Sequence, residues 1–383
     1  MLQLIYSLTA GDHCPPIIDD QIDRFIQKLK FCFEDLLWLA RTSSFEVARV
    51  AYDGYASLSV PERYAFFLSP AVFAEILNQR AVGTPDLRIL SKFCISEATV
   101  AAAPPQDSQG ADQQWWTPLF SRAHHVTGES GKVYTAPVLG GSVTIDVSSP
   151  FCRRCDMTSP VFFGEFIGLS AEETTRVVSK LSAAFSEVQE IAPVFAHIIR
   201  NYTRVVCVRK RPGAPPSSEQ LSNEIGAIRL LNVQDPVYTH EQLMDDLIHE
   251  SVHNLLSTYE FLEHPFQIVG RNQDQDVRAV SPWSMRALRV LPFLHAAFVY
   301  FALLHFSMKR LETSNLSDEQ RHQAIRRRNR YASGFLMPGS LSDYVRHLAD
   351  VDPRTLHAMD QMQQMVRRRF SPTTVHAKQR SFS

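Results

Sequence analysis

Hydrophobic and polar positions follow a helical period over most of the first hundred residues. Apolar side chains recur every three or four positions from Ile22 to Leu39, and shorter segments near 44–52, 61–79 and 86–98 repeat this pattern. The pattern changes after Trp115, where two short apolar runs flank the pair Gly140-Gly141. Paired glycines between such runs are typical of a hairpin turn. We therefore expect an N-terminal helical region at 1–105 and a β-hairpin region at 115–155.

The rest of the chain alternates strand-like and helix-like segments before it becomes helical. Ser170 and Glu173 form a capping-box pattern that predicts the start of a helix running through about Arg200. Two short apolar runs, 205–210 and 225–232, are typical of buried strands, and helical patterns dominate from 285 to about 366. These elements predict an α+β fold, predominantly helical, with a small sheet next to the helix that contains residues 249–253. We expect one metal-binding catalytic region at 160–366 and a disordered tail at 371–383.

Composition and charge exclude several classes of protein. The formal net charge of −1 provides no overall field that would attract nucleic acid or an anionic membrane. The most apolar run, Leu291 to Phe306, contains two histidines and is too short for a membrane span. Six cysteines in 383 residues are too few for a disulfide framework. We expect a cytoplasmic protein with neither nucleic acid nor membrane as a partner.

The segment His249-Glu250-Ser251-Val252-His253 carries the clearest chemical signal. Its flanks contain neither proline nor glycine and present an apolar stripe at helical spacing, which predicts a helix. Residues four apart lie on one face of a helix, so His249 and His253 can share one metal ion. The carboxylate of Glu250 would then face a metal-bound water or the substrate, and it is the candidate catalytic residue.

A catalytic metal needs a third protein ligand, and several residues are candidates. Glu312 lies in a polar terminal turn, while Glu260 and Glu263 would have to leave the helix face sharply. His295 is the better candidate, because it lies near the start of the most apolar helical segment, three residues after Pro292. Three histidines with open positions suit either zinc or Fe(II).

Three sequence blocks resemble a known family. They are Asp246-Leu-Ile-His-Glu-Ser-Val-His-Asn-Leu-Leu, then Ser281-Pro-Trp, then Leu294-His-Ala-Ala-Phe-Val-Tyr. In order and spacing they resemble the HExxH-type peptide-modification proteins of ribosomal natural-product biosynthesis. The resemblance covers roughly residues 220–310. It implies an Fe(II)- and 2-oxoglutarate-dependent dioxygenase that hydroxylates a side chain of a precursor peptide, at Cβ.

The co-substrate of such an enzyme needs a cation. Arginine offers a planar fork to the distal carboxylate of 2-oxoglutarate, and Arg278, Arg286 and Arg289 lie between the metal-binding segment and His295. The family pattern has an arginine directly after Ser-Pro-Trp, where this chain has Ser284. Trp283 is a candidate wall of the site. Two alternatives remain: an HExxH zinc metallopeptidase and a non-catalytic peptide-binding protein with a vestigial site.

Overall fold

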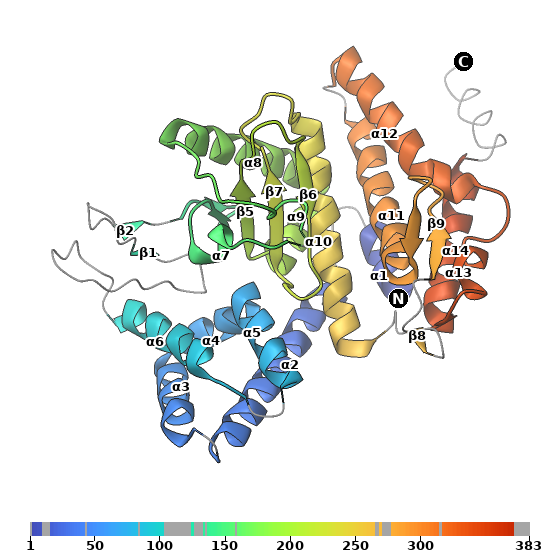
Figure 1. The fold of residues 1–383 in the computed structure, drawn as a ribbon. Helices are drawn as coiled ribbons and strands as arrows, with labels where there is room; N and C mark the ends of the chain where they lie inside the picture. The colour runs from blue at the N-terminus through green and yellow to red at the C-terminus, as the bar shows by residue number, and fades with distance from the viewer. Residues whose placement is uncertain are drawn as a thin grey trace, which may run out of the picture. The chain divides into compact units, whose positions relative to one another are not determined.

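A computed structural model of the chain gives an α+β fold in which helices predominate, as the sequence predicts (Figure 1). It describes residues 2–9, 16–42, 44–82, 85–102, 124–125, 133–134, 136–157, 159–264, 268–269, 277–313 and 316–370. The predicted disordered tail at 371–383 lies outside these residues. The chain divides into two compact units, each assembled from separate stretches. Unit 1 comprises 1–19, 188–197 and 259–383, and unit 2 comprises 20–187 and 198–258.

The bounds of the elements follow the chain from the N-terminus. The helices of the first half are α1 (Leu2–Thr9), α2 (Pro16–Ala40), α3 (Phe45–Ser57), α4 (Val60–Leu68), α5 (Pro70–Ala81), α6 (Arg88–Ala102), α7 (Pro150–Arg153), α8 (Ala171–Ile191) and α9 (Pro193–Tyr202). Those of the second half are α10 (His240–Glu263), α11 (Val290–Glu312), α12 (Asp318–Leu336), α13 (Asp343–Arg346) and α14 (Pro353–Phe370). The strands are β1 (His124–His125), β2 (Val133–Tyr134), β3 (Val138–Leu139), β4 (Val143–Asp146), β5 (Val205–Arg209), β6 (Ser217–Glu219), β7 (Ala227–Leu231), β8 (Ile268–Val269), β9 (Arg278–Val280), β10 (Ala287–Arg289) and β11 (Asp350–Val351).

Unit 2 contains a five-stranded mixed sheet in the order β3-β4-β5-β7-β6. The three central strands run parallel, and every residue of β4, β5 and β7 is buried. Continuous apolar strands are typical of a parallel sheet covered on both faces. β6 pairs antiparallel with β7 and forms an edge of the sheet. The sheet therefore has a buried centre. Its edge strand, β6, lies between the two predicted strands in the sequence but outside them in the sheet.

The predicted hairpin forms between β3 and β4. Gly140 and Gly141 make the turn with φ of 57° and 82°, in the left-handed region that favours glycine. A Cβ on Gly140 would lie 2.6 Å from the ring of Phe185, so glycine is also required there for space. The hairpin is shorter than expected, because Val133 and Tyr134 pair with β1 instead.

The helix predicted from Ser170 to about Arg200 is two helices in the structure. Its start is confirmed: the backbone N–H of Ser170 donates to Glu173 Oε2 at 2.7 Å, and that of Glu173 donates to Ser170 Oγ at 3.2 Å. The single-helix prediction is wrong beyond Ile191, where α8 ends and α9 begins at Pro193. Proline has no N–H to donate and clashes with the preceding turn, so the chain restarts the helix there.

Unit 1 is built mainly from α11, α12 and α14, together with the β9-β10 hairpin. In the described part of the chain, α11 is the one helix long and apolar enough to span a membrane by length and composition. Within its most apolar window 78% of the residues are buried inside the protein, which is also typical of a core helix. Most of its residues from Val290 to Arg310 are buried, so α11 is a core helix of unit 1.

Candidate metal centre on helix α10

Helix α10 brings the two histidines together as the sequence predicts. The Nε2 atoms of His249 and His253 are 3.2 Å apart, and their ring centroids are separated by 4.9 Å. Both side chains are partly buried. With a metal–nitrogen distance of about 2.1 Å, a nitrogen separation of 3.2 Å corresponds to an N–metal–N angle of about 100°. That angle lies between the octahedral and tetrahedral values, so the pair fits one shared metal ion.

Glu250 lies beside this pair and is 4% exposed. One potential ligand atom from each of His249, Glu250 and His253 lies within 4.8 Å of the others, so this group could hold a metal ion. Glu250 Oε1 accepts a hydrogen bond of 2.6 Å from the hydroxyl of Ser218 on β6. Burial raises the pKa of Glu250 to about 8; the Ser218 hydrogen bond lowers the pKa, while nearby Glu219 raises it further. The carboxylate is thus held at the junction of α10 and the edge strand.

The sheet fixes the position of α10 through buried polar contacts. Asn254 Oδ1 accepts from the backbone N–H of Gly226 at 2.8 Å, and its Nδ2 donates to the carbonyl of Ala227 at 3.3 Å. The hydroxyls of Ser251 and Thr203 lie 2.8 Å apart. These contacts lie one turn or less from the two histidines, so the imidazoles have a rigid support.

A second carboxylate lies one turn before His249. Asp246 accepts a hydrogen bond of 2.5 Å from the Tyr238 hydroxyl. Burial raises the pKa of Asp246 to about 6, and the neighbouring His249 lowers it. A carboxylate near a metal-binding imidazole can orient the ring, and the sequence pattern alone did not identify this residue.

The arginine network behind β6 was also missed by sequence reasoning. Arg229 on β7 is buried and forms ion pairs with Glu224 at 2.7 Å, Glu219 at 3.0 Å and Asp156 at 3.1 Å. Its guanidinium lies 4.2 Å from the centre of the Phe162 ring. Because Glu219 directly follows Ser218, this network fixes the strand that contacts Glu250. The only sequence signal for it is an arginine inside an apolar strand.

The proposed third ligand belongs to the other unit. His295 lies on α11 in unit 1, whereas His249 and His253 lie in unit 2. His295 is 7% exposed, and burial lowers its pKa to about 4. Its imidazole is therefore neutral at physiological pH, which is the state that a metal ligand requires. Of the alternative ligands, Glu312 is already engaged by Arg369 at 3.4 Å and Lys309 at 3.6 Å.

The three candidate anchor arginines lie in or beside the β9-β10 hairpin, and all are exposed. Arg278 and Arg289 are direct partners across the antiparallel pair, so their side chains leave the same face. Arg286 lies in the loop that connects β9 to β10. Its carbonyl accepts a hydrogen bond of 2.8 Å from the backbone N–H of Ser281. Like charges directly opposite each other repel, and a bound anion would relieve this repulsion.

Trp283 lies in the core of unit 1. Its ring stacks on Tyr300 with centroids 4.9 Å apart and packs edge-on against Phe335. Its Nε1 donates to the carbonyl of Tyr331 at 2.9 Å. A Cβ on Gly334 would lie 2.3 Å from the indole, which shows how closely α12 approaches it. These contacts give Trp283 a packing role in unit 1.

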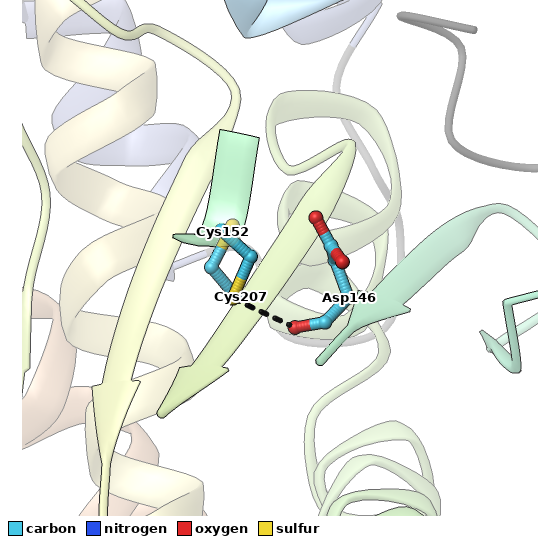
Figure 2. Close-up of side chains that lie close together, drawn as sticks. All are labelled: Asp146, Cys152 and Cys207. Atoms are coloured by element: carbon cyan, nitrogen blue, oxygen red, sulfur yellow. Dashed lines mark hydrogen bonds between the residues drawn. The ribbon is translucent and has the colours of Figure 1, made fainter. Parts of the chain in front are cut away.

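A second cluster of potential ligands, Asp146, Cys152 and Cys207, is fully buried (Figure 2). The Asp146 carboxylate already accepts from the N–H groups of Ser148 and Ser149 and from the Ser149 hydroxyl. Cys152 Sγ donates to the carbonyl of Asp146, which is the dashed line in Figure 2. Burial raises the pKa of the Cys152 thiol, and its Sγ also donates to the carbonyl of Val208. The cluster attaches α7 to the sheet.

No protein-family model matches the chain, and no curated protein matches its sequence at a significant level.

Proposed function

We propose that this protein is an Fe(II)- and 2-oxoglutarate-dependent oxygenase that hydroxylates, at Cβ, a side chain of a ribosomally made peptide. The observation that carries the proposal is the pair of imidazole nitrogens 3.2 Å apart on α10, with a buried carboxylate beside them. Two nitrogen ligands on one helix leave several metal positions open, and such an oxygenase needs open positions for 2-oxoglutarate and dioxygen. The resemblance of three sequence blocks supports the choice of reaction.

In this proposal each residue has a defined task. His249 and His253 hold the metal, and His295 is the third ligand. A bound Fe(II) would supply the activation of dioxygen together with 2-oxoglutarate. Glu250, held by Ser218, orients the substrate and is not required to take a proton from water.

The exposed pair Arg278 and Arg289 is the proposed anchor for the distal carboxylate of 2-oxoglutarate. The two residues are opposite each other in the hairpin, and Arg289 directly precedes the first residue of α11, the helix that carries His295. A guanidinium pair on one face can bind a carboxylate through charge-assisted hydrogen bonds. Arg286 is the alternative anchor.

The edge strand β6 is the proposed binding site for the peptide. It ends the five-stranded sheet, and its Ser218 contacts Glu250 beside the histidine pair. An extended peptide can add to such an edge by main-chain hydrogen bonds, with alternate side chains on each face. A peptide bound there would run past the candidate metal centre.

The second candidate is a zinc metallopeptidase. It is favoured by the position of the Glu250 carboxylate within 4.8 Å of potential ligand atoms of both histidines, where a base would meet a metal-bound water. A peptidase would need Glu250 to accept a proton, whereas an oxygenase would not. A third candidate, a peptide-binding protein with a vestigial site, predicts no turnover at all.

Mass spectrometry of a synthetic peptide pool incubated with wild-type protein and with Glu250→Gln distinguishes these functions. The oxygenase predicts a gain of one oxygen that depends on Fe(II) and 2-oxoglutarate and that persists at a reduced level in Glu250→Gln. Backbone cleavage that needs no 2-oxoglutarate and disappears in Glu250→Gln would establish the peptidase. Unchanged peptides in both samples would support the non-catalytic alternative.

A further inference from the structure

Helices α11 and α14 enclose an apolar pocket of about 270 Å³ in unit 1. Its walls include Leu304 and Met308 from α11, and Met365, Val366 and Phe370 from α14. Pockets for drug-sized ligands occupy roughly 300–1,000 Å³. This pocket is smaller, and its size suits one or two apolar side chains. Methionine side chains are flexible and polarisable, so such walls adapt to differently shaped residues.

The surroundings of the pocket are positively charged. Arg368 and Arg369 belong to its lining, and the guanidinium of Arg328 on α12 lies 5.6 Å from the centre of the Phe370 ring. His305, also in the lining, is neutral, because burial and the charge of Arg369 lower its pKa to about 4. Arg369 also forms an ion pair of 3.4 Å with Glu312. Two guanidinium groups therefore line the apolar hollow, and a third lies next to Phe370 in its wall.

The basic wall is held in a fixed position by the neighbouring arginine. Arg367 donates to the carbonyls of Phe335 at 3.2 Å and Gly339 at 2.7 Å, and also to that of Met337. These bonds tie the last turn of α14 to the end of α12. Helix ends leave carbonyls without partners, and Arg367 satisfies them. The pocket is thus preformed, which lowers the entropic cost of binding.

We propose that this pocket docks an acidic peptide segment, which inserts one large apolar side chain between α11 and α14 while flanking carboxylates pair with Arg328, Arg368 and Arg369. The apolar hollow is complementary to the apolar side chain of such a peptide, and the cationic rim is complementary to its carboxylates. The proposal does not depend on the reaction performed at α10. The chain's own residues 371–383 are a poor match, because they contain Lys378 and Arg380 and no acidic residue.

A peptide fits the pocket better than a membrane surface does. A membrane-binding site presents apolar side chains that protrude into the lipid, with basic residues around them. Here the apolar surface is recessed and receives a side chain. Binding to lipid is therefore an outcome that the experiment must exclude.

Fluorescence anisotropy with a labelled peptide, Glu-Glu-Glu-Leu-Glu-Glu-Glu, tests the proposal on the full chain. Arg368→Glu combined with Arg369→Glu should weaken binding about tenfold or more, as expected when attractive charge pairs become repulsive. Met308→Trp, which fills the hollow, should weaken it similarly without changing charge. Arg88→Glu serves as the control, because Arg88 is exposed on α6 in unit 2, and it should bind like the wild type.

A second peptide, with serine in place of leucine, separates pocket binding from general attraction to arginine. We expect it to bind about tenfold more weakly than the leucine peptide, because the apolar contact is lost. Equal binding of the two peptides, or no binding of the leucine peptide, would overturn the proposal. Association with phosphatidylserine vesicles that Met308→Trp abolishes would also overturn it, since the pocket would then take lipid.

Discussion

The buried side chain of Arg229, which pairs with Glu219 on the edge strand β6, allows a quantitative test of how the candidate site is supported. In Arg229→Met the Phe162 ring keeps an apolar neighbour. Glu219 loses its ion pair with Arg229, and Glu224 loses the same cation but keeps its ion pair with Arg154. Their side chains are only 6% and 10% exposed, so two carboxylates remain close together with little solvent. Removing one partner of a buried ion pair costs about 3–5 kcal/mol. We expect the free energy of unfolding to fall by that amount.

Urea denaturation followed by fluorescence measures this loss. With an m-value of about 3 kcal/mol/M, a loss of 3–5 kcal/mol lowers the midpoint by about 1–1.7 M. Arg176→Met is the matched control: its pair with Glu172 is solvent-exposed, so it should cost less than about 1 kcal/mol. An Arg229→Met loss no larger than that of the control would refute the reasoning.

Three further predictions concern the candidate site. His295→Ala should lower the metal content as much as loss of either α10 histidine, measured by elemental analysis; full metal occupancy would shift the assignment of the third ligand to another residue. Arg289→Gln should raise the KM for 2-oxoglutarate at least about tenfold, because a charge-assisted hydrogen bond is lost; an unchanged KM in a succinate-release assay would point to Arg286. Ser218→Ala should reduce peptide hydroxylation while metal content stays intact, since only the support of Glu250 is removed; an equal loss of metal would give Ser218 a different role.

Local patterns in the sequence were sufficient for the larger elements. The stripe around Leu247 and Val252 predicts α10, and the runs 205–210 and 225–232 predict β5 and β7, all of which the structure contains. β6 was missed because Ser217, Ser218 and Glu219 carry no apolar alternation, and only pairing with β7 makes them a strand. Strand formation by such residues depends on tertiary context, which propensity does not capture.

The candidate site shows the same division between local and non-local information. The spacing of His249 and His253 fixes their proximity, because four residues make about one helical turn. The contact of Glu250 with Ser218 joins residues 32 positions apart, and the Arg229 network reaches Asp156, 73 positions away. No local pattern encodes such contacts. The break at Pro193 was visible in the sequence, but the helical period on both sides obscured it.

The most direct test of the central claim is the metal content of the anaerobically purified protein, measured together with succinate release after 2-oxoglutarate and dioxygen are added. We predict about one Fe(II) bound per chain and succinate formation that is lost in the His249→Ala and His253→Ala variants. Tightly bound zinc without succinate release, or iron binding and succinate release that survive both substitutions, would contradict the account.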